Sequence, residues 1–296
     1  MKNVKSLKRY DCTDQGQNHL IYEAEYNENG KPLVEIEYSQ GTGPVSTTTY
    51  EYDEEGALIA EILQGEEKEA FQRLDYTISE DKKKMVKTLT YSDGSTEKEE
   101  IEVSEGKKTI RKFDLDGEVT EETTETFRED EQVETVEHYN ADMDSREKHV
   151  YTYDDQNRMI KEVVLVDDEE YMTIQWERDE KGRALIEVAN NQDGDLMHKH
   201  YYKYEGDLLI EEGIEEYQSY NNKLRFQFEY DDNGRLVRQI QETYNGELIQ
   251  EVGYELNERG DVEMARFIRT GLYHMIYGSS SVDYNQVLRN EIEYFE

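Results

Sequence analysis

The sequence predicts an all-β fold, a repetitive antiparallel meander of about 20 strands. Two observations predict it. A short turn motif recurs along the 296 residues, and the segments between its copies alternate apolar and polar side chains with a period of two, as Tyr22 and Ala24 do around Glu23. Helical spacing is not sustained anywhere in the chain, so the pattern favours strands.

The turn motif consists of an aromatic residue, Asp or Asn, two polar residues, Gly or Asn, one polar residue and an aliphatic residue. It is clearest at 26–33, 52–58, 153–159 and 230–236. The Asp or Asn side chain can accept a hydrogen bond from the backbone two residues on. The Gly or Asn supplies a positive φ, which most other side chains resist. Each copy therefore predicts a tight turn followed by a new strand.

The motif sets the period of the chain. Its first positions, degenerate copies included, follow one another at intervals of 23 to 28 residues. A second, looser set of turns lies halfway between them, for example at Gly94, Gly194 and Gly246. One period of about 25 residues is thus two turns and two strands of about 8 residues each. The anchoring first positions are Tyr26, Tyr52, Tyr76, Val103, Phe127, Tyr153, Trp176, Tyr204, Tyr230 and Tyr254.

The alternation predicts a sheet with one tyrosine and aliphatic face and one acidic face. Sheet twist argues against a flat ribbon of so many strands. We therefore expect a curved or partly closed sheet, either an open shell or a wide barrel, and a homodimer is another way to cover the apolar face. The expected organisation is an N-terminal cap at 1–19, about ten hairpin repeats at 20–264 and a C-terminal cap at 265–296.

The Tyr-Asp-x-x-Gly-x-Leu signature resembles the YD-repeat family, also called the RHS-repeat family. The resemblance covers most of residues 20–264 and implies a curved sheet built from repeats. In large members of that family the repeats form a spiralling shell around a toxin domain, or part of an extracellular adhesion protein. This chain is shorter and more acidic, and shows no toxin-like C-terminal domain. The resemblance is carried by Tyr52, Asp53, Gly56, Leu58, Tyr153, Asp154, Met159, Tyr230, Asp231, Gly234 and Leu236.

The chain is strongly acidic, with 71 Asp and Glu against 34 Lys and Arg and a formal net charge of −37. Such a surface repels nucleic-acid phosphates and anionic lipids, so we expect neither nucleic acid nor a membrane as a partner. Cys12 is the only cysteine, so no internal disulfide can form. Neither the apolar core of a signal peptide nor a span of about 18 apolar residues is present, and we expect a cytoplasmic protein.

The sequence marks no metal or cofactor site. The turns at 53–56 and 231–234 resemble the start of an EF-hand calcium loop. The rest of that loop and its flanking helices are missing, so their carboxylates are interpreted as turn formers. His198 and His200 share one face of a predicted strand, but two ligands do not make a zinc site without a third nearby. No third ligand is marked.

No catalytic set is marked either. Pairs of carboxylates occur throughout so acidic a chain and carry no information, and neither a phosphate-binding glycine loop nor a nucleophile beside a base is present. We therefore expect a protein that is not an enzyme. The repeated tyrosines offer an aromatic stripe for sugars or peptides, but their fixed place at strand ends favours a role in the core of the sheet.

The C-terminal segment breaks the repeat pattern. Residues 266–277 are apolar and locally basic in an acidic chain. One interpretation is an atypical unit that caps the repeat array. The other is a contact surface for a partner, with Tyr273, Met275 and Tyr277 as the anchoring side chains. Both interpretations stay open on the sequence.

These observations favour a protein that acts by binding another protein. The first hypothesis is an immunity or antitoxin-like inhibitor that captures a basic partner, such as a toxin, on an acidic curved sheet. Electrostatic steering speeds the capture of a cationic protein by such a surface. The alternative is a structural or adhesive YD-repeat protein of the cell envelope, with carbohydrate binding among its roles. The partner and the face that binds it stay open.

Overall fold

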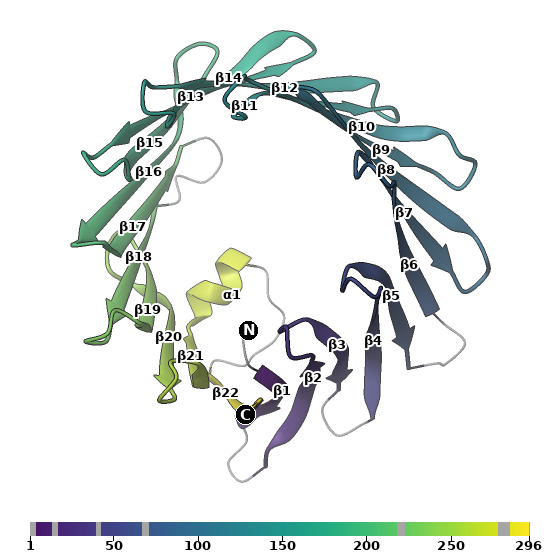
Figure 1. Ribbon diagram of the computed structural model, residues 1–296. Coiled ribbons are helices and arrows are strands. Elements are labelled where there is room, and N and C mark those ends of the chain that lie inside the picture. Colours follow the sequence, from purple (N-terminus) through teal and green to yellow (C-terminus); the bar gives the residue numbers. More distant parts are fainter. Residues whose placement is uncertain are drawn as a thin grey trace. The chain divides into compact units, whose positions relative to one another are not determined.

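The computed structural model describes residues 4–13, 17–39, 43–66, 71–217, 223–277 and 285–295, without the side chains of residues 274 and 275. This part of the chain forms 22 β-strands and one short α-helix. Neighbouring strands pair antiparallel (Figure 1). The prediction of an all-β antiparallel meander is confirmed. The strands fall into two compact units.

The first unit comprises Met1–Thr48 and His200–Glu296. Strands β17 to β22 pair in chain order. Strand β1 continues the sheet, because it pairs with β22 on one side and with β2 on the other, and β2 pairs with β3. The first and last strands are thus neighbours, and neither is left as an unpaired edge. The strands are β1 (Val4–Asp11), β2 (His19–Tyr26), β3 (Pro32–Tyr38), β17 (Leu208–Glu216), β18 (Lys223–Tyr230), β19 (Leu236–Thr243), β20 (Leu248–Leu256), β21 (Val262–Arg269) and β22 (Asn285–Tyr294).

The second unit is Thr49–Lys199. Its strands β5 to β15 also pair in chain order, each with the next. The chain passes from one unit to the other within two further strands, β4 (Pro44–Tyr52) and β16 (Leu196–Glu205). The strands of the second unit are β5 (Leu58–Gly65), β6 (Phe71–Ile78), β7 (Lys84–Tyr91), β8 (Thr96–Ser104), β9 (Lys107–Phe113), β10 (Val119–Phe127), β11 (Val133–Asn140), β12 (Ser145–Tyr153), β13 (Met159–Val166), β14 (Glu169–Arg178) and β15 (Ala184–Asn191).

The motif turns have the hydrogen bonds that the sequence predicts. In one copy, Asp231 Oδ1 accepts hydrogen bonds from the backbone N–H groups of Asn233 and Arg235, each at 2.9 Å. Gly234 in this turn has a φ of 74°, and Asn157 takes the same left-handed conformation in its own turn with a φ of 59°. The Asp or Asn side chain therefore satisfies the turn backbone, and Gly or Asn supplies the reversal.

A β-bulge in the motif hairpins overturns the predicted separation of the two faces. In the β2–β3 hairpin Tyr26 lies opposite Pro32, but a bulge next to Tyr26 shifts the register by one residue, so that Ala24 lies opposite Glu35. Without the extra residue Ala24 would lie opposite Val34. Because side chains alternate along a strand, a shift of one residue moves a whole apolar row to the other face.

The expectation of one tyrosine and aliphatic face and one acidic face is therefore wrong. In the β2–β3 hairpin an apolar row and an acidic row lie side by side, with Tyr22 opposite Glu37 and Ala24 opposite Glu35. The same register shift occurs in the hairpins β9–β10, β10–β11, β12–β13, β14–β15, β18–β19 and β20–β21. The bulge thus belongs to the repeat, and in the β2–β3 hairpin it mixes apolar and acidic rows on the same face.

The buried core is thin. Several of the buried apolar residues are small, and Ala24, Ala60 and Ala189 are completely buried in the middle of their strands. Most of the large side chains are only half buried. The sheet is consequently held by its backbone ladder and by side-chain contacts between neighbouring strands, which are the unit of stabilisation in a sheet.

Motif side chains also tie each repeat to its neighbours. Tyr230 Oη donates a hydrogen bond to the carbonyl of Leu209 at 2.8 Å, on the preceding strand β17, which belongs to the previous repeat. Tyr153 makes the equivalent bond in the other unit. Arg235 packs over the next motif turn, where a Cβ added to Gly260 would lie 3.1 Å from the Arg235 Cδ. The motif tyrosines therefore have a structural role.

The helix α1 (Gly271–Tyr277) is the only helix in the part of the chain that the structure describes. It packs against β20 and β21, on one face of the first unit (Figure 1). Within the described residues, no helix is long and apolar enough to cross a membrane.

Candidate functional site: a histidine face

The strand registers collect histidines on one face of the second unit. Residues directly opposite on paired strands, and residues two apart on one strand, lie on the same face. By this rule His138 and His149, on β11 and β12, share a face with Trp176 on β14 and Glu187 on β15. The buried Val164 lies on it as well. We call this surface the histidine face.

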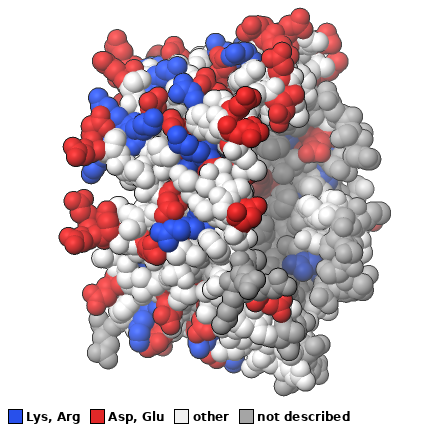
Figure 2. Space-filling view, turned by 90° about the vertical axis from the view of Figure 1, so that its right-hand side faces the viewer, with Lys and Arg blue, Asp and Glu red and all other residues white. Residues whose placement is uncertain are grey.

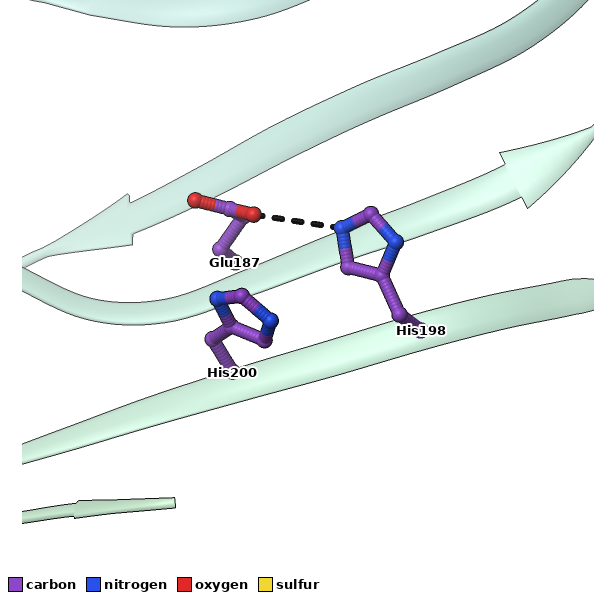
Figure 3. Close-up of side chains that lie close together, drawn as sticks. All are labelled: Glu187, His198 and His200. Carbon is purple, nitrogen blue, oxygen red and sulfur yellow. Dashed lines mark hydrogen bonds and ion pairs between the residues drawn. The ribbon is translucent and has the colours of Figure 1, made fainter. Parts of the chain in front are cut away.

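Glu187, His198 and His200 form a cluster of ligand-type side chains. Among the described residues they are the one group of three such side chains whose ligand atoms all lie within 4.8 Å of one another. His198 Nε2 lies 3.2 Å from Glu187 Oε1. Both imidazoles extend from β16 towards the Glu187 carboxylate (Figure 3). Two imidazole nitrogens and a carboxylate oxygen are a ligand set that suits zinc.

A tight turn reverses the chain between β15 and β16 and brings these side chains together. The backbone N–H of Asn191 donates to the carbonyl of Asp195 at 2.9 Å. Asn191 Oδ1 accepts from the N–H groups of Asp193 and Asp195 at 3.0 and 2.8 Å. Gly194 supplies the reversal with a φ of 85°. This turn belongs to the looser set that the sequence shows, yet it has the same hydrogen bonds as the motif turns.

Trp176 orients the Glu187 carboxylate. Its indole N–H donates a hydrogen bond to Glu187 Oε2 at 2.8 Å, while Oε1 of the same carboxylate lies next to His198. One carboxylate oxygen is thus held by β14 and the other is turned towards the imidazole. Outer hydrogen bonds of this kind fix the direction of metal-binding side chains.

His149 on the same face is arranged differently. Its Nδ1 lies 2.6 Å from a Glu162 oxygen, and its Nε2 lies 2.8 Å from a Glu147 oxygen. Burial opposes the charged form, but the hydrogen bonds to Glu162 and Glu147 outweigh it and raise the pKa of His149 above its ordinary value. Because two carboxylates occupy the two ring nitrogens separately, this histidine forms an ion-pair triad, not a convergent set of ligands.

A row of alternating charge crosses four strands of the histidine face. Lys87 on β7 lies opposite Glu99, Glu99 lies opposite Lys112, and Lys112 lies opposite Glu121 on β10. The ion pairs Lys87–Glu99 and Lys112–Glu121 each have N–O distances of 2.6 Å. The lysines of this row are therefore matched within it by carboxylates of neighbouring strands.

The charged row lines a cavity of about 560 Å³. Leu74, Leu89 and Phe113 contribute apolar walls, and five acidic side chains, three basic side chains and Thr120 line the rest. Since acidic groups exceed basic ones, the cavity attracts cations. A mixture of apolar wall and carboxylates suits Lys or Arg side chains, whose alkyl stems pack on apolar surface while the charged head meets an acid.

The predicted contact residues of the C-terminal segment lie on α1. The Tyr273 and Tyr277 rings contact each other with centroids 4.9 Å apart, and the Arg269 guanidinium lies 5.1 Å from the Tyr273 ring centroid. Tyr277 is half exposed, and its hydroxyl pairs with the buried Gln241. The Met275 side chain lies outside the described residues. That a partner contacts this helix stays a prediction.

The sequence singled out His198 and His200 but not their third neighbour. Glu187 stands 11 residues before His198 and is one of 71 acidic residues. The signal that would have found it is the turn at Asp193, which folds β16 back towards β15. Trp176 entered the sequence analysis only as an anchor of the repeat, and its bond to Glu187 follows from strand register.

Comparisons with known proteins add little. No protein family matches the chain, and no curated protein is similar to it in sequence. Solved structures with a detectable likeness include a porin-like protein from Bacteroides uniformis, with 10% identity and a TM-score of 0.34 over 98% of both chains. The TcdB2–TccC3 complex has 8% identity and a TM-score of 0.33 over 87% of this chain and 18% of that one. A porin-like protein from Bacteroides vulgatus has 12% identity and a TM-score of 0.28 over 86% of this chain and 100% of that one. Likeness at this level supports no conclusion about family or function.

Proposed function

We propose that this chain is a YD-repeat protein that binds a basic protein partner, in the manner of an immunity or antitoxin-like inhibitor of a toxin. The charge balance carries the proposal. The 71 acidic residues outnumber the 34 Lys and Arg, which gives a net charge of −37. Carboxylates would therefore remain unpaired even if every Lys and Arg formed an ion pair with one of them. On the side shown in Figure 2, lysines and arginines lie among acidic side chains. The excess acidic field would steer a cationic protein.

The assignment to YD repeats is supported by how the motif residues are used. The Asp oxygen satisfies the turn, the Gly supplies the positive φ, and the Tyr hydroxyl reaches a strand of the previous repeat. These roles explain why the residue types recur together at a fixed spacing. The Asp, Gly and Tyr of the motif therefore serve as a scaffold.

We place the contact at the cavity on β7–β10. It combines an acidic excess with apolar walls at Leu89 and Phe113, which is the complement of a Lys- or Arg-rich segment. Its Lys87 and Lys112 already pair with carboxylates of the sheet, so the remaining acidic groups set the local field. The proposal therefore predicts binding that weakens with salt.

The test compares two charge-reversed variants with equal net charge. One carries Glu97→Lys and Asp142→Lys in the cavity, and its control carries Glu54→Lys and Glu55→Lys in an exposed turn. Immobilised proteins are exposed to host lysate at low and high salt, and the affinity of any 1:1 partner is then measured by calorimetry. Lysozyme, an unrelated cationic protein, serves as the competitor that measures non-specific charge attraction.

We expect one basic partner that wild type and the turn variant bind at low salt. It should leave at high salt, resist the lysozyme competitor and bind the cavity variant at least about tenfold more weakly. The proposal fails if no stoichiometric protein is retained, if retention ignores salt, or if both variants bind equally. Loss to lysozyme would reduce the interaction to general charge attraction.

A further inference from the structure

We propose that Glu187, His198 and His200 bind a divalent transition-metal ion, with zinc as the expected occupant. The ligands come from two strands, a carboxylate on β15 and two imidazoles spaced two residues apart on β16 (Figure 3). Residues two apart on a strand point to the same side. The two histidines therefore present their rings together, and the carboxylate meets them from the preceding strand. This proposal is independent of the protein partner.

The spacing of the ligand atoms suits one ion. Zinc bonds of about 2.0–2.1 Å in tetrahedral geometry place neighbouring ligand atoms about 3.3 Å apart. His198 Nε2 and Glu187 Oε1 are already 3.2 Å apart. The widest separation in the cluster is at most 4.8 Å, so small side-chain rotations bring all three atoms into bonding distance. The ion would take the place of the present hydrogen bond between His198 and Glu187.

The chemistry of the ligands separates this cluster from the acidic surface around it. Calcium and magnesium prefer oxygen ligands and would bind weakly wherever carboxylates gather. Imidazole nitrogens suit zinc and its neighbours in the first transition row. Asp231, in a turn that resembles the start of a calcium loop, has its oxygens engaged by Arg235 and the turn backbone. The Asp231 carboxylate thus stabilises its turn, whereas the two histidines are ligands that suit zinc better than calcium or magnesium.

The residues around the cluster would hold a bound ion in place and still leave it accessible to solvent. Trp176 holds one Glu187 oxygen at 2.8 Å, while the other lies 3.2 Å from His198 Nε2 inside the cluster; a hydrogen bond such as that of Trp176 is the outer support that metal-binding carboxylates usually have. The side chains of His198 and Glu187 are 26% and 18% exposed, so the ion is partly shielded and still reachable from solvent. Three protein ligands leave a tetrahedral zinc with one position for water or an added group.

The chain carries its own reporter for this site. Trp176 is the only tryptophan, and it is hydrogen-bonded to the proposed ligand Glu187. Purified protein is stripped of metal with a chelator and titrated with Zn²⁺, while the tryptophan is excited at a wavelength that tyrosine does not absorb. Mg²⁺ and Ca²⁺ are titrated in parallel. Co²⁺ replaces Zn²⁺ in a second titration, read by the visible absorption that a tetrahedral site gives it.

Two variants remove ligands, His198→Gln and His200→Gln. Two matched controls, His138→Gln and His149→Gln, remove histidines from the same face but not from the cluster. The thermal midpoint of each stripped variant shows that it folds. Because Trp176→Phe loses the reporter, its zinc affinity is measured by competition with a metal-binding dye.

We expect a 1:1 change in Trp176 emission with Zn²⁺ and none with Mg²⁺ or Ca²⁺. Each ligand variant should bind zinc about 100-fold more weakly, Trp176→Phe about 10-fold more weakly, and the two controls as wild type. The proposal is overturned if the ligand variants and controls bind zinc equally, or if Mg²⁺ and Ca²⁺ give the same signal. If a ligand variant does not fold, the Co²⁺ spectrum of the wild-type protein decides. An octahedral Co²⁺ spectrum, or no Co²⁺ absorption at all, contradicts the proposed site.

Discussion

The turn at 231–235 and the hairpin of β15 and β16 use the same kinds of residue in opposite ways. In the turn, Asp231 accepts two backbone hydrogen bonds through Oδ1 and pairs with Arg235 through Oδ2. In the hairpin, Glu187 is anchored through Oε2 by Trp176, and its Oε1 lies next to His198. Both oxygens of the Asp231 carboxylate are thus engaged in hydrogen bonds that stabilise the turn. The Glu187 carboxylate is positioned for a ligand.

The difference teaches where to look for function in a repetitive protein. The residues that recur make the bonds that build and join the repeats, so their recurrence is explained by the fold. The histidines of β16 are not required by the motif, and they meet a carboxylate that a neighbouring strand orients. Replacing the Asp, Gly or Tyr of a motif turn should therefore cost stability and leave zinc affinity unchanged, while replacing His198 or His200 should weaken zinc binding and leave stability unchanged.

The largest stability effect is expected for Gly234→Ala. Gly234 has a φ of 74°, and an L residue in that conformation costs about 1–2 kcal/mol. Gly253→Ala is the matched control, because Gly253 lacks a positive φ and a Cβ there meets nothing within 4 Å. Chemical denaturation should show the loss for Gly234→Ala alone. Equal losses in both variants would break the comparison, as would a change in zinc affinity.

A smaller effect is expected for Tyr230→Phe. It removes the hydroxyl that donates to the Leu209 carbonyl at 2.8 Å, and a hydrogen bond of this kind contributes about 1 kcal/mol. Tyr171→Phe is the control, since Tyr171 is 50% exposed. Denaturation midpoints of the two variants and wild type measure the difference. Indistinguishable midpoints for Tyr230→Phe and wild type would remove the proposed tie between repeats.

The smallest effects are expected from two ion pairs with opposite pH dependence. Arg235 and the turn backbone lower the pKa of Asp231 to about 2, below an ordinary value of about 3.9. The stability that Asp231 contributes is thus present above about pH 4 and is lost as the pH falls towards 2. The pKa of His149 is raised, so its contribution is present below about pH 6.5 and is lost as the pH rises through the higher folded value.

Thermal midpoints across pH separate these two contributions. Asp231→Asn should melt below wild type at pH 7 and together with it near pH 2. His149→Gln should show its largest deficit at acidic pH, down to about pH 5, and a smaller one at pH 9. A deficit that is constant across pH in either variant would mean that the ion pair contributes nothing there.

The sequence was sufficient for the strands and the turns because their causes are local. Asp231 and Gly234 show their roles through the residue types and spacing alone. The register of the paired strands could not be predicted from the sequence, because a bulge adds one residue to a hairpin without disturbing the alternation in either strand. For that reason the sequence placed Ala24 on an apolar face, whereas its neighbour across the hairpin is Glu35.

Only part of the histidine cluster could be predicted from the sequence, for the same reason. The spacing of His198 and His200 on one strand is visible in the sequence. Their meeting with Glu187, and the support that Glu187 receives from Trp176, depends on how three strands lie together. Among 71 acidic residues, only that arrangement distinguishes one carboxylate from the rest.

The most direct test of the distinction between scaffold and site is anomalous X-ray diffraction from crystals grown with zinc. Data collected on both sides of the zinc absorption edge locate the ion without assumptions about its ligands. The account predicts one strong peak within bonding distance of Glu187, His198 and His200, and none at the Asp-containing motif turns. Peaks at the turns with an empty histidine cluster would contradict it.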